Sequence, residues 1–215
     1  MRIKPRFIHL SALSLFLLCG CELIDGSGAA APITEDQGCT TCRIFVSATT
    51  TQGDFGGAEQ ADTICDVDAN NPNDGATFKA LMYDAGVREA CTTDMCSGSG
   101  VAEHIDWVLK SNTDYTRLDG TPIATADANG LLPDTLTNAI SATSATVWHG
   151  ILYQESVMLI PAQRWMESGD NCNGWVDNSN SRAGRIGIAD QVNNSYINAG
   201  NPVCQNTYSF YCVEQ

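Results

Sequence analysis

Apolar positions in the first third of the chain change from strand-like to helix-like spacing. Residues 43–50 (RIFVSATT) are β-branched and apolar, which predicts a strand, and a glycine cluster at residues 53–57 ends it. The next apolar residues recur every three to four positions, which predicts a helix with this buried face: Ala58, Ala61, Ile64 and Cys65.

The same spacing predicts a second helix over residues 78–85. Its apolar residues fall at i, i+3, i+4 and i+7, and Asp74 precedes them as a candidate cap for the first free backbone N–H groups. The members of this face are Phe78, Leu81, Met82 and Ala85.

The second half of the chain has the pattern of strands separated by long loops. Residues 146–152 (TVWHGIL) and 156–161 are predicted as core strands, and residues 207–213 as a final, alternating strand. Residues 91–138 are rich in turn signals, and residues 168–207 are dense in Asn, Gly and Ser. Two early helices followed by several strands predict an α+β fold.

The first twenty residues have the pattern of an export signal. Three basic residues precede an apolar run from Phe7 to Leu18, which is too short to cross a bilayer as a helix. The sequence Leu18-Cys19-Gly20-Cys21 then resembles a bacterial lipobox, with a small residue before the cysteine that receives the lipid. We expect a lipoprotein signal peptide over residues 1–20, a lipidated flexible tether over residues 21–38 and a domain over residues 39–215.

An alternative is ordinary signal cleavage after the alanines at residues 29–31. Those residues lie well beyond the apolar run, so we favour lipidation of Cys21. The acyl chains would be the membrane attachment.

The charge balance excludes several classes of partner. The chain has 25 acidic and 11 basic residues, and removing the signal would lower the basic count to 8 and bring the net charge from −14 to −17. A field of this sign repels phosphate backbones and anionic lipid surfaces. We therefore expect no nucleic-acid partner.

The cysteine count predicts a disulfide framework. Eight of the 10 cysteines lie in the expected domain, and an even number in an exported chain favours pairing, although the spacing allows 105 pairings. A redox role for the motif of Cys39 and Cys42 is disfavoured because it precedes a strand rather than opening a helix. A zinc site formed by Cys39, Cys42, Cys91 and Cys96 is disfavoured in an oxidising compartment.

The order of these elements and cysteines resembles a C-type-lectin-like domain, and most closely endostatin. The segments that carry the resemblance, in order, are GGAEQAD (56–62), TFKAL (77–81), VWHG (147–150), CQNTY (204–208) and CVE (212–214). Together with the lipobox they resemble the spirochaetal endostatin-like lipoproteins, known chiefly from Leptospira. The resemblance spans residues 43–214.

This resemblance implies two disulfides, Cys65–Cys212 between the first helix and the last strand and Cys172–Cys204 across the long loop. Three pairings of the remaining four cysteines stay open. We favour the local pairs Cys39–Cys42 and Cys91–Cys96.

No catalytic constellation is visible in the expected domain. Its two histidines are His104 and His149, and neither accompanies a Gly-x-Ser-x-Gly or His-Glu-x-x-His motif. We interpret His149 as a packing residue and His104 as a surface or hydrogen-bonded one. An enzyme would need a buried, pKa-shifted carboxylate beside one of them. We therefore expect a protein that is not an enzyme and has no cofactor.

Known ligand sites of related folds do not carry over. The segment beginning at Asp66 starts like a calcium loop, but Asn71 stands where a glycine is needed and Thr77 where a bidentate glutamate belongs. The triplets of calcium-dependent sugar-binding lectins are missing, so we expect neither calcium-dependent sugar binding nor a metal site. Endostatin's heparin-binding arginine clusters and N-terminal zinc-binding histidines are also missing.

The resemblance implies a lipid-anchored, adhesin-like binding module that is exposed on the cell surface at the outer membrane. Relatives are credited with binding host laminin, fibronectin, plasminogen or the complement regulator factor H. We expect the contact residues to be Trp175, Asp177 and Tyr196 in the long loop, since exposed aromatic residues are good interface anchors. The alternative for Trp175 is a place in the core. The alternative is a periplasm-facing envelope lipoprotein with no host ligand.

Overall fold

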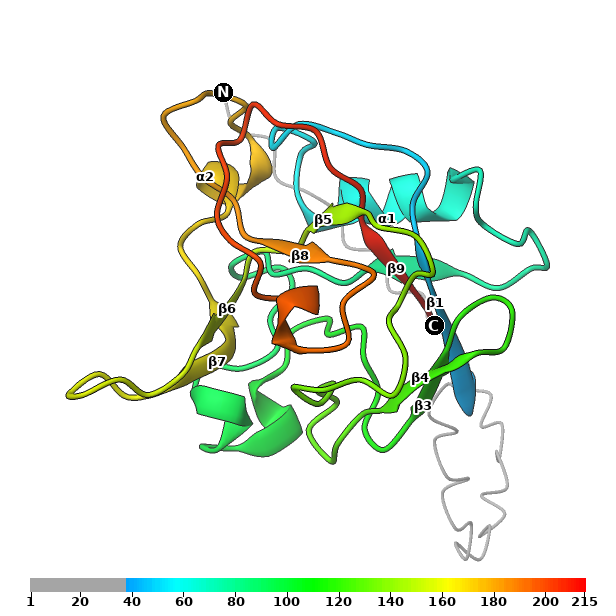
Figure 1. The fold of residues 1–215 in the computed structure, drawn as a ribbon, viewed down its shortest axis with the longest axis horizontal. Coiled ribbons are helices and arrows are strands. Elements are labelled where there is room, and N and C mark those ends of the chain that lie inside the picture. The colour runs from blue at the N-terminus through cyan, green and yellow to red at the C-terminus, as the bar shows by residue number, and fades with distance from the viewer. Residues whose placement is uncertain (1–37) are drawn as a thin grey trace, which may run out of the picture. The chain divides into compact units, whose positions relative to one another are not determined.

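The computed structural model describes residues 38–215 as a mixed α+β domain dominated by strands. Its main sheet has the order β2-β9-β1-β3-β4. The final strand β9 (Tyr211–Glu214) lies between β1 (Thr41–Val46) and β2 (Phe78–Ala80) and is antiparallel to both. The parallel neighbour of β1 is β3 (Asp114–Thr116), which pairs antiparallel with β4 (Pro122–Thr125). The two ends of the domain therefore meet in one sheet (Figure 1).

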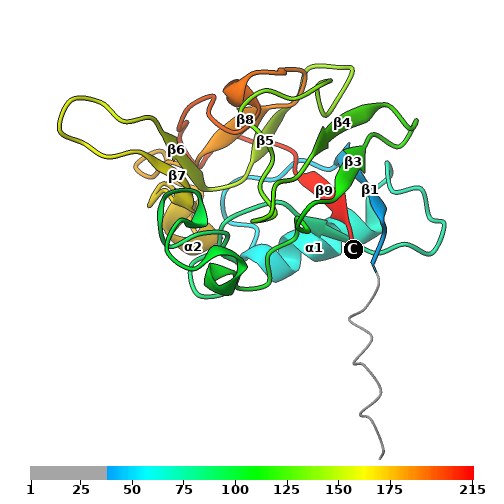
Figure 2. The same cartoon turned by 90° about the horizontal axis from the view of Figure 1, so that it is seen from below.

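Two smaller antiparallel sheets complete the strand content of the described residues. One pairs β5 (Thr146–Trp148) with β8 (Ile186–Ile188), and the other pairs β6 (Ile151–Gln154) with β7 (Gln163–Glu167). The β6–β7 hairpin stands out from the body of the domain in both views (Figures 1 and 2).

Helices are few in the described part. The long one is α1 (Ala58–Val67), and α2 (Cys172–Trp175) is a single turn. Three short 3-10 helices are η1 (Asp94–Cys96), η2 (Gly100–Glu103) and η3 (Asn194–Tyr196). None of the helices between residues 38 and 215 is both long and apolar enough to span a membrane.

The predicted first helix is confirmed as α1. Ala58, Ala61 and Cys65 are buried, and Ile64 packs against the same core. Its N-terminus is capped from a distance, because Asp84 accepts the Ala58 N–H at 2.8 Å. Gly57 permits this approach, since a Cβ there would lie 2.7 Å from the Asp84 carboxylate, and its φ of 91° is unfavourable for other residues.

The predicted helix over residues 78–85 is wrong. Phe78 to Ala80 form β2 instead, with Phe78 and Ala80 buried on either side of the half-buried Lys79. Pairing with β9 satisfies this backbone, so a long-range ladder overrides the local helical spacing. Asp74 consequently caps no helix and forms an ion pair with Arg43.

Four disulfides link the eight cysteines of the described domain. They are Cys39–Cys42, Cys65–Cys212, Cys91–Cys96 and Cys172–Cys204, which are the expected pairs. The pair Cys65–Cys212 fastens α1 to β9, an interior strand of the main sheet. Three fully buried tryptophans, Trp148, Trp165 and Trp175, fill much of the space behind the sheets.

Candidate functional site

The two aromatic residues expected to be exposed contacts are both in the core, so that prediction is wrong. Trp175 is fully buried, stacks on Phe55 and donates its indole N–H to the Tyr83 carbonyl at 2.9 Å. Tyr196 is also fully buried, and its hydroxyl donates to the Pro133 carbonyl at 3.0 Å. Both rings therefore belong to the core although their loop is rich in polar residues. Asp177 stays half-exposed, accepting the Ser179 N–H at 2.7 Å.

The histidine of the VWHG segment is a buried structural residue. The backbone N–H of Ile151 donates to His149 Nδ1 at 3.0 Å, while His149 Nε2 has no hydrogen-bond partner. Burial lowers the pKa of His149 to about 3, so the ring is neutral at physiological pH. It has no carboxylate or nucleophile with which to share a proton.

The acidic segment that resembles a calcium loop accepts hydrogen bonds from backbone N–H groups. Asp68 is buried, and its carboxylate accepts the N–H groups of Ala48, Thr49 and Asn70 at 2.8–2.9 Å. Its oxygens therefore hold the chain that follows β1. Across residues 38–215 no group of three or more His, Cys, Asp or Glu side chains is placed to hold a metal ion.

The β6–β7 hairpin carries the most conspicuous apolar surface of the described domain. Val157 and Ile160 exchange backbone hydrogen bonds of 3.1 and 2.8 Å, which places Met158 and Leu159 at the two corners of a tight turn. The exposed fractions of these four side chains, in order, are 50%, 102%, 97% and 51%. We call residues 157–160 the hairpin tip.

The tip corrects the prediction of a core strand at residues 156–161. The apolar run is real, but it crosses the end of a hairpin and faces solvent. Met158 has a φ of 49°, a conformation that glycine or asparagine adopts at lower cost. Because those residues are missing, turn signals in the sequence could not reveal the hairpin. The tip exposes apolar surface and strains the backbone at the same place.

The base of the hairpin is held to the loop closed by Cys91 and Cys96. Asp94 on η1 accepts the backbone N–H, Nε and Nη2 of Arg164 at 3.0, 3.0 and 2.9 Å. The neighbouring Trp165 is an extra residue in β7, where the β6–β7 register shifts, and its φ is 59°. This bulge buries the Trp165 ring, and the Trp165 carbonyl accepts the Cys91 N–H at 3.1 Å.

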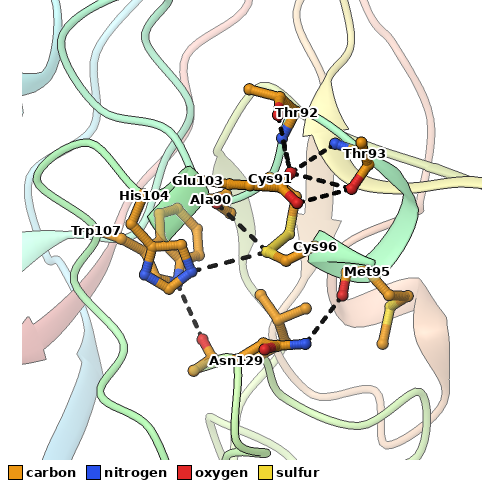
Figure 3. Close-up of a disulfide and its surroundings, with 12 residues drawn as sticks. Ala90, Cys91, Thr92, Thr93, Met95, Cys96, Glu103, His104, Trp107 and Asn129 are labelled. Carbon is orange, nitrogen blue, oxygen red and sulfur yellow. Dashed lines mark hydrogen bonds between the residues drawn. A yellow bond between two sulfur atoms is a disulfide. The ribbon is translucent and has the colours of Figure 1, made fainter. Parts of the chain in front are cut away.

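A buried carboxylate organises this disulfide loop (Figure 3). Glu103 accepts the N–H and hydroxyl groups of Thr92 and Thr93 and the N–H groups of Gly98 and Ser99, at 2.7–3.1 Å. Burial alone would raise the pKa of Glu103, but these hydrogen bonds outweigh it and lower the pKa to about 2. The loop that supports the hairpin is therefore itself fixed by an ionised side chain. The sequence offered no cue to Glu103.

His104 lies beside the same disulfide. Its Nε2 is 3.7 Å from Cys96 Sγ, and its ring lies near Trp107, with ring centres 6.3 Å apart. Burial lowers the pKa of His104, which favours the neutral ring. The sulfurs are paired and buried, so this contact is packing around the disulfide rather than a nucleophile with its base.

We expect Glu103→Gln to destabilise the protein by about 2–3 kcal/mol at pH 7, because an amide presents fewer acceptors to the same donors. Since the pKa is lower in the folded protein than the unfolded value of about 4.3, ionised Glu103 stabilises the fold above that pH. This contribution is lost as the pH falls towards 2. Urea unfolding at several pH values should show the gap between parent and variant narrowing on acidification. A gap that is constant from pH 7 to 2 would contradict this role.

The described domain also has an open groove of about 400 Å³ beside the C-terminal half of β1. It is lined by residues 44–47, 117–119 and 140–143, together with Asn70 and Ala145. Arg117 donates from Nε to the Ala139 carbonyl at 2.7 Å and from Nη2 to the Ser141 carbonyl at 3.4 Å, so this guanidinium braces one wall. The arrangement offers no nucleophile–base pair.

Comparison with protein-family models matches residues 48–192, about two thirds of the chain, to the family described as "Protein of unknown function (DUF1554)". The chain belongs to the DUF1554 family. No curated protein matches it.

The DUF1554 match includes α1, the loop closed by Cys91 and Cys96 and the whole β6–β7 hairpin. It ends before β9, the strand between β1 and β2 in the main sheet. Two disulfides, Cys65–Cys212 and Cys172–Cys204, cross the end of the match. The folded unit of this DUF1554 protein is therefore larger than the matched region.

Proposed function

We propose that this DUF1554 protein is an endostatin-like, lipid-anchored binding module on the outer surface of an outer membrane. It has a C-type-lectin-like fold and is held to the membrane by acyl chains on Cys21. It binds host extracellular proteins, with laminin, fibronectin, plasminogen and factor H as candidates. Export, lipidation and the family resemblance rest on the sequence motifs, and residues 1–37 lie outside the described structure.

The arrangement of disulfides supports the fold proposal. A first helix tied to the last strand by Cys65–Cys212 and a long loop closed by Cys172–Cys204 are the two bridges that the endostatin resemblance implies. The last strand also lies in the main sheet beside the first, so both ends of the domain meet there.

The observation that carries the binding role is the exposed apolar tip on a rigid support. Exposed apolar clusters on monomeric proteins mark interaction sites. Here the cluster sits on a hairpin fixed by Arg164, Asp94 and the Cys91–Cys96 loop, which is a preorganised contact element. The described residues offer no comparable arrangement for catalysis.

The charge distribution supports a basic partner. Six of the eight basic residues between positions 38 and 215 form ion pairs with carboxylates, and the domain keeps a large excess of acid. A basic ligand surface would be attracted over long range, which raises the association rate and makes it salt-dependent.

The test uses the oxidised chain from residue 21 onward, with Cys21→Ser to prevent lipidation. It is titrated against laminin, fibronectin, plasminogen and factor H at low and physiological salt, with an unrelated protein of similar acidic charge as control. We expect saturable, micromolar or tighter binding to at least one ligand, weakened by salt and lost on reduction. Binding equal to the control, or none, would overturn the proposal.

Protease treatment of intact cells tests the location. The proposal expects the lipidated protein to be cleaved from outside. Protection from protease would favour the alternative, an envelope lipoprotein that faces the periplasm.

A further inference from the structure

We propose that the hairpin tip is the anchor of the binding interface and inserts into an apolar pocket on a partner protein whose rim is basic. This inference rests on the proposed function and names the contact residues and the chemistry of the partner. The tip comprises Val157, Met158, Leu159 and Ile160.

Two features of this turn each raise the free energy of the free protein, which indicates that the tip serves to contact a partner. Met158 and Leu159 expose essentially their whole side chains to water. Met158 also holds a positive φ that glycine would adopt without strain. A polar turn would remove both costs and leave the hydrogen bonds between Val157 and Ile160 in place. An apolar pocket on a partner removes the first cost by covering the side chains.

The composition of the hairpin disfavours a lipid surface as the occupant. Between Glu155 and Gln163 there is no Lys, Arg, Trp or Tyr, the side chains that anchor protein segments at the bilayer interface. The excess of acidic residues repels anionic headgroups.

The position of the tip on the domain leaves it accessible to a partner. The hairpin projects from the end of the domain opposite the C-terminus (Figures 1 and 2). The start of β1 lies beside the C-terminal strand, because Ile44 pairs with Val213 and Arg43 bonds Glu214. The tip therefore lies at the end of the domain away from the start of β1 and the C-terminus (Figures 1 and 2).

A second copy of the chain fits the tip poorly. Two copies carry the same strong negative charge and repel each other.

The charges around the tip determine which charge we expect at the rim of the partner's pocket. Near the tip the hairpin contributes Glu155 and Arg164, and the guanidinium of Arg164 already forms an ion pair with Asp94. Glu167 lies at the other end of the hairpin, opposite Ile151. The carboxylate next to the apolar tip is therefore Glu155, in a domain that has a large excess of acidic residues. A partner with Lys or Arg around an apolar pocket matches both features, and the flexible Met158 side chain can adapt to pockets of different shape.

The test compares three forms of the oxidised chain from residue 21 onward, each with Cys21→Ser, against the host protein that binds most tightly in the titration above. The tip variant is Met158→Gly with Leu159→Asn, a residue pair that favours a tight hairpin turn, so the hairpin should still form. The control variant is Val67→Asn with Val176→Asn, which removes two exposed valines elsewhere, 77% and 63% exposed. Thermal unfolding verifies that all three forms are folded.

We expect the tip variant to bind roughly 30-fold more weakly or worse, as for a central interface anchor, and the control to bind like the parent. A fourth form, the conservative exchange Met158→Leu with Leu159→Met, is verified as folded in the same way and should keep the affinity. Equal binding by parent and tip variant would overturn the inference and leave the proposed function standing. A parent that binds none of the four host proteins overturns both.

Two further measurements distinguish the proposed partner protein from the two other candidate occupants, a second copy of the chain and a bilayer. Sedimentation of the parent should show a monomer, whereas a dimer lost in the tip variant would make a second copy the occupant. Neutral phosphatidylcholine vesicles should not bind the parent. Tip-dependent vesicle binding would make a bilayer the occupant, and either result would overturn the inference.

Discussion

Replacing Cys65 and Cys212 together by alanine is expected to lower the free energy of unfolding by about 4–5 kcal/mol. The two cysteines are 147 residues apart, so their bridge removes much of the conformational entropy of the unfolded chain. Both side chains are fully buried between α1 and β9. Loss of the bridge therefore also removes the covalent link between α1, the one long helix of the described domain, and β9. Equilibrium unfolding in urea under oxidising conditions measures the change.

The matched control is the double alanine variant of Cys39 and Cys42. These residues are three positions apart, and the same entropy relation predicts a loss of only about 2 kcal/mol. Equal losses in the two double variants would show that loop length does not set the contribution of the long bridge.

The second large effect is expected for Arg88→Met, a loss of about 3–5 kcal/mol at pH 7. Arg88 is buried, and its guanidinium donates to both Asp62 oxygens at 2.7 Å, to the Ala80 carbonyl at 2.9 Å and to the carboxylate and carbonyl of Asp106. It joins α1 to β2 and to the loop at Asp106. Methionine fills similar space but leaves the Asp62 carboxylate without its cation and Asp106 with Lys79 alone, which is the costly way to break such a network.

Acid should diminish the effect of Arg88→Met. Burial alone would raise the pKa of Asp106, but hydrogen bonds from Arg88 and Lys79 outweigh it and lower the pKa. Ionised Asp106 therefore stabilises the parent above about pH 4, and this contribution is lost as the pH falls through the lowered pKa. Urea unfolding at pH 7 and pH 3 should show a smaller gap between parent and variant at pH 3.

The control for Arg88 is Arg182→Met. Arg182 is exposed, its Nε lies 3.9 Å from the Asp177 carboxylate, and the exchange should change stability by less than about 1 kcal/mol. If Arg88→Met were as mild as Arg182→Met, the buried network would contribute little to the fold.

The Arg88 network and the loop around Glu103 are neighbours, joined by the backbone bridge between Glu89 and Ile105, but they hold different segments. Arg88 fastens α1 to β2, whereas Glu103 fixes the disulfide loop beneath the hairpin. A variant in the Arg88 network should therefore reduce the folded fraction but leave the affinity of the folded molecules for a ligand at the tip unchanged. Variants at the tip should lower the affinity of the folded molecules for this ligand and leave the folded fraction unchanged.

Several features of the domain were predictable from local sequence. The face of α1 follows the spacing of Ala58, Ala61 and Cys65, and the β-branched run after Arg43 does contain most of β1. The even cysteine count predicted a disulfide framework. The choice of pairs came from the family resemblance and from short spacing, and the structure has those pairs.

Other features were decided by contacts between distant segments. The helical spacing of Phe78, Leu81 and Met82 is genuine, yet pairing with β9, more than 130 residues away, makes the segment a strand. Trp175 lies in a polar loop but is buried because Phe55 and Tyr83 receive its ring and its N–H.

The sequence by itself determined where apolar residues stand, which local periods they follow and how many cysteines can pair. Only the tertiary structure decided which apolar residues are covered. Trp175 and the hairpin tip show the difference, since the first is enclosed and the second is left in water. Burial depends on what the rest of the chain brings against a side chain, and no local pattern records that.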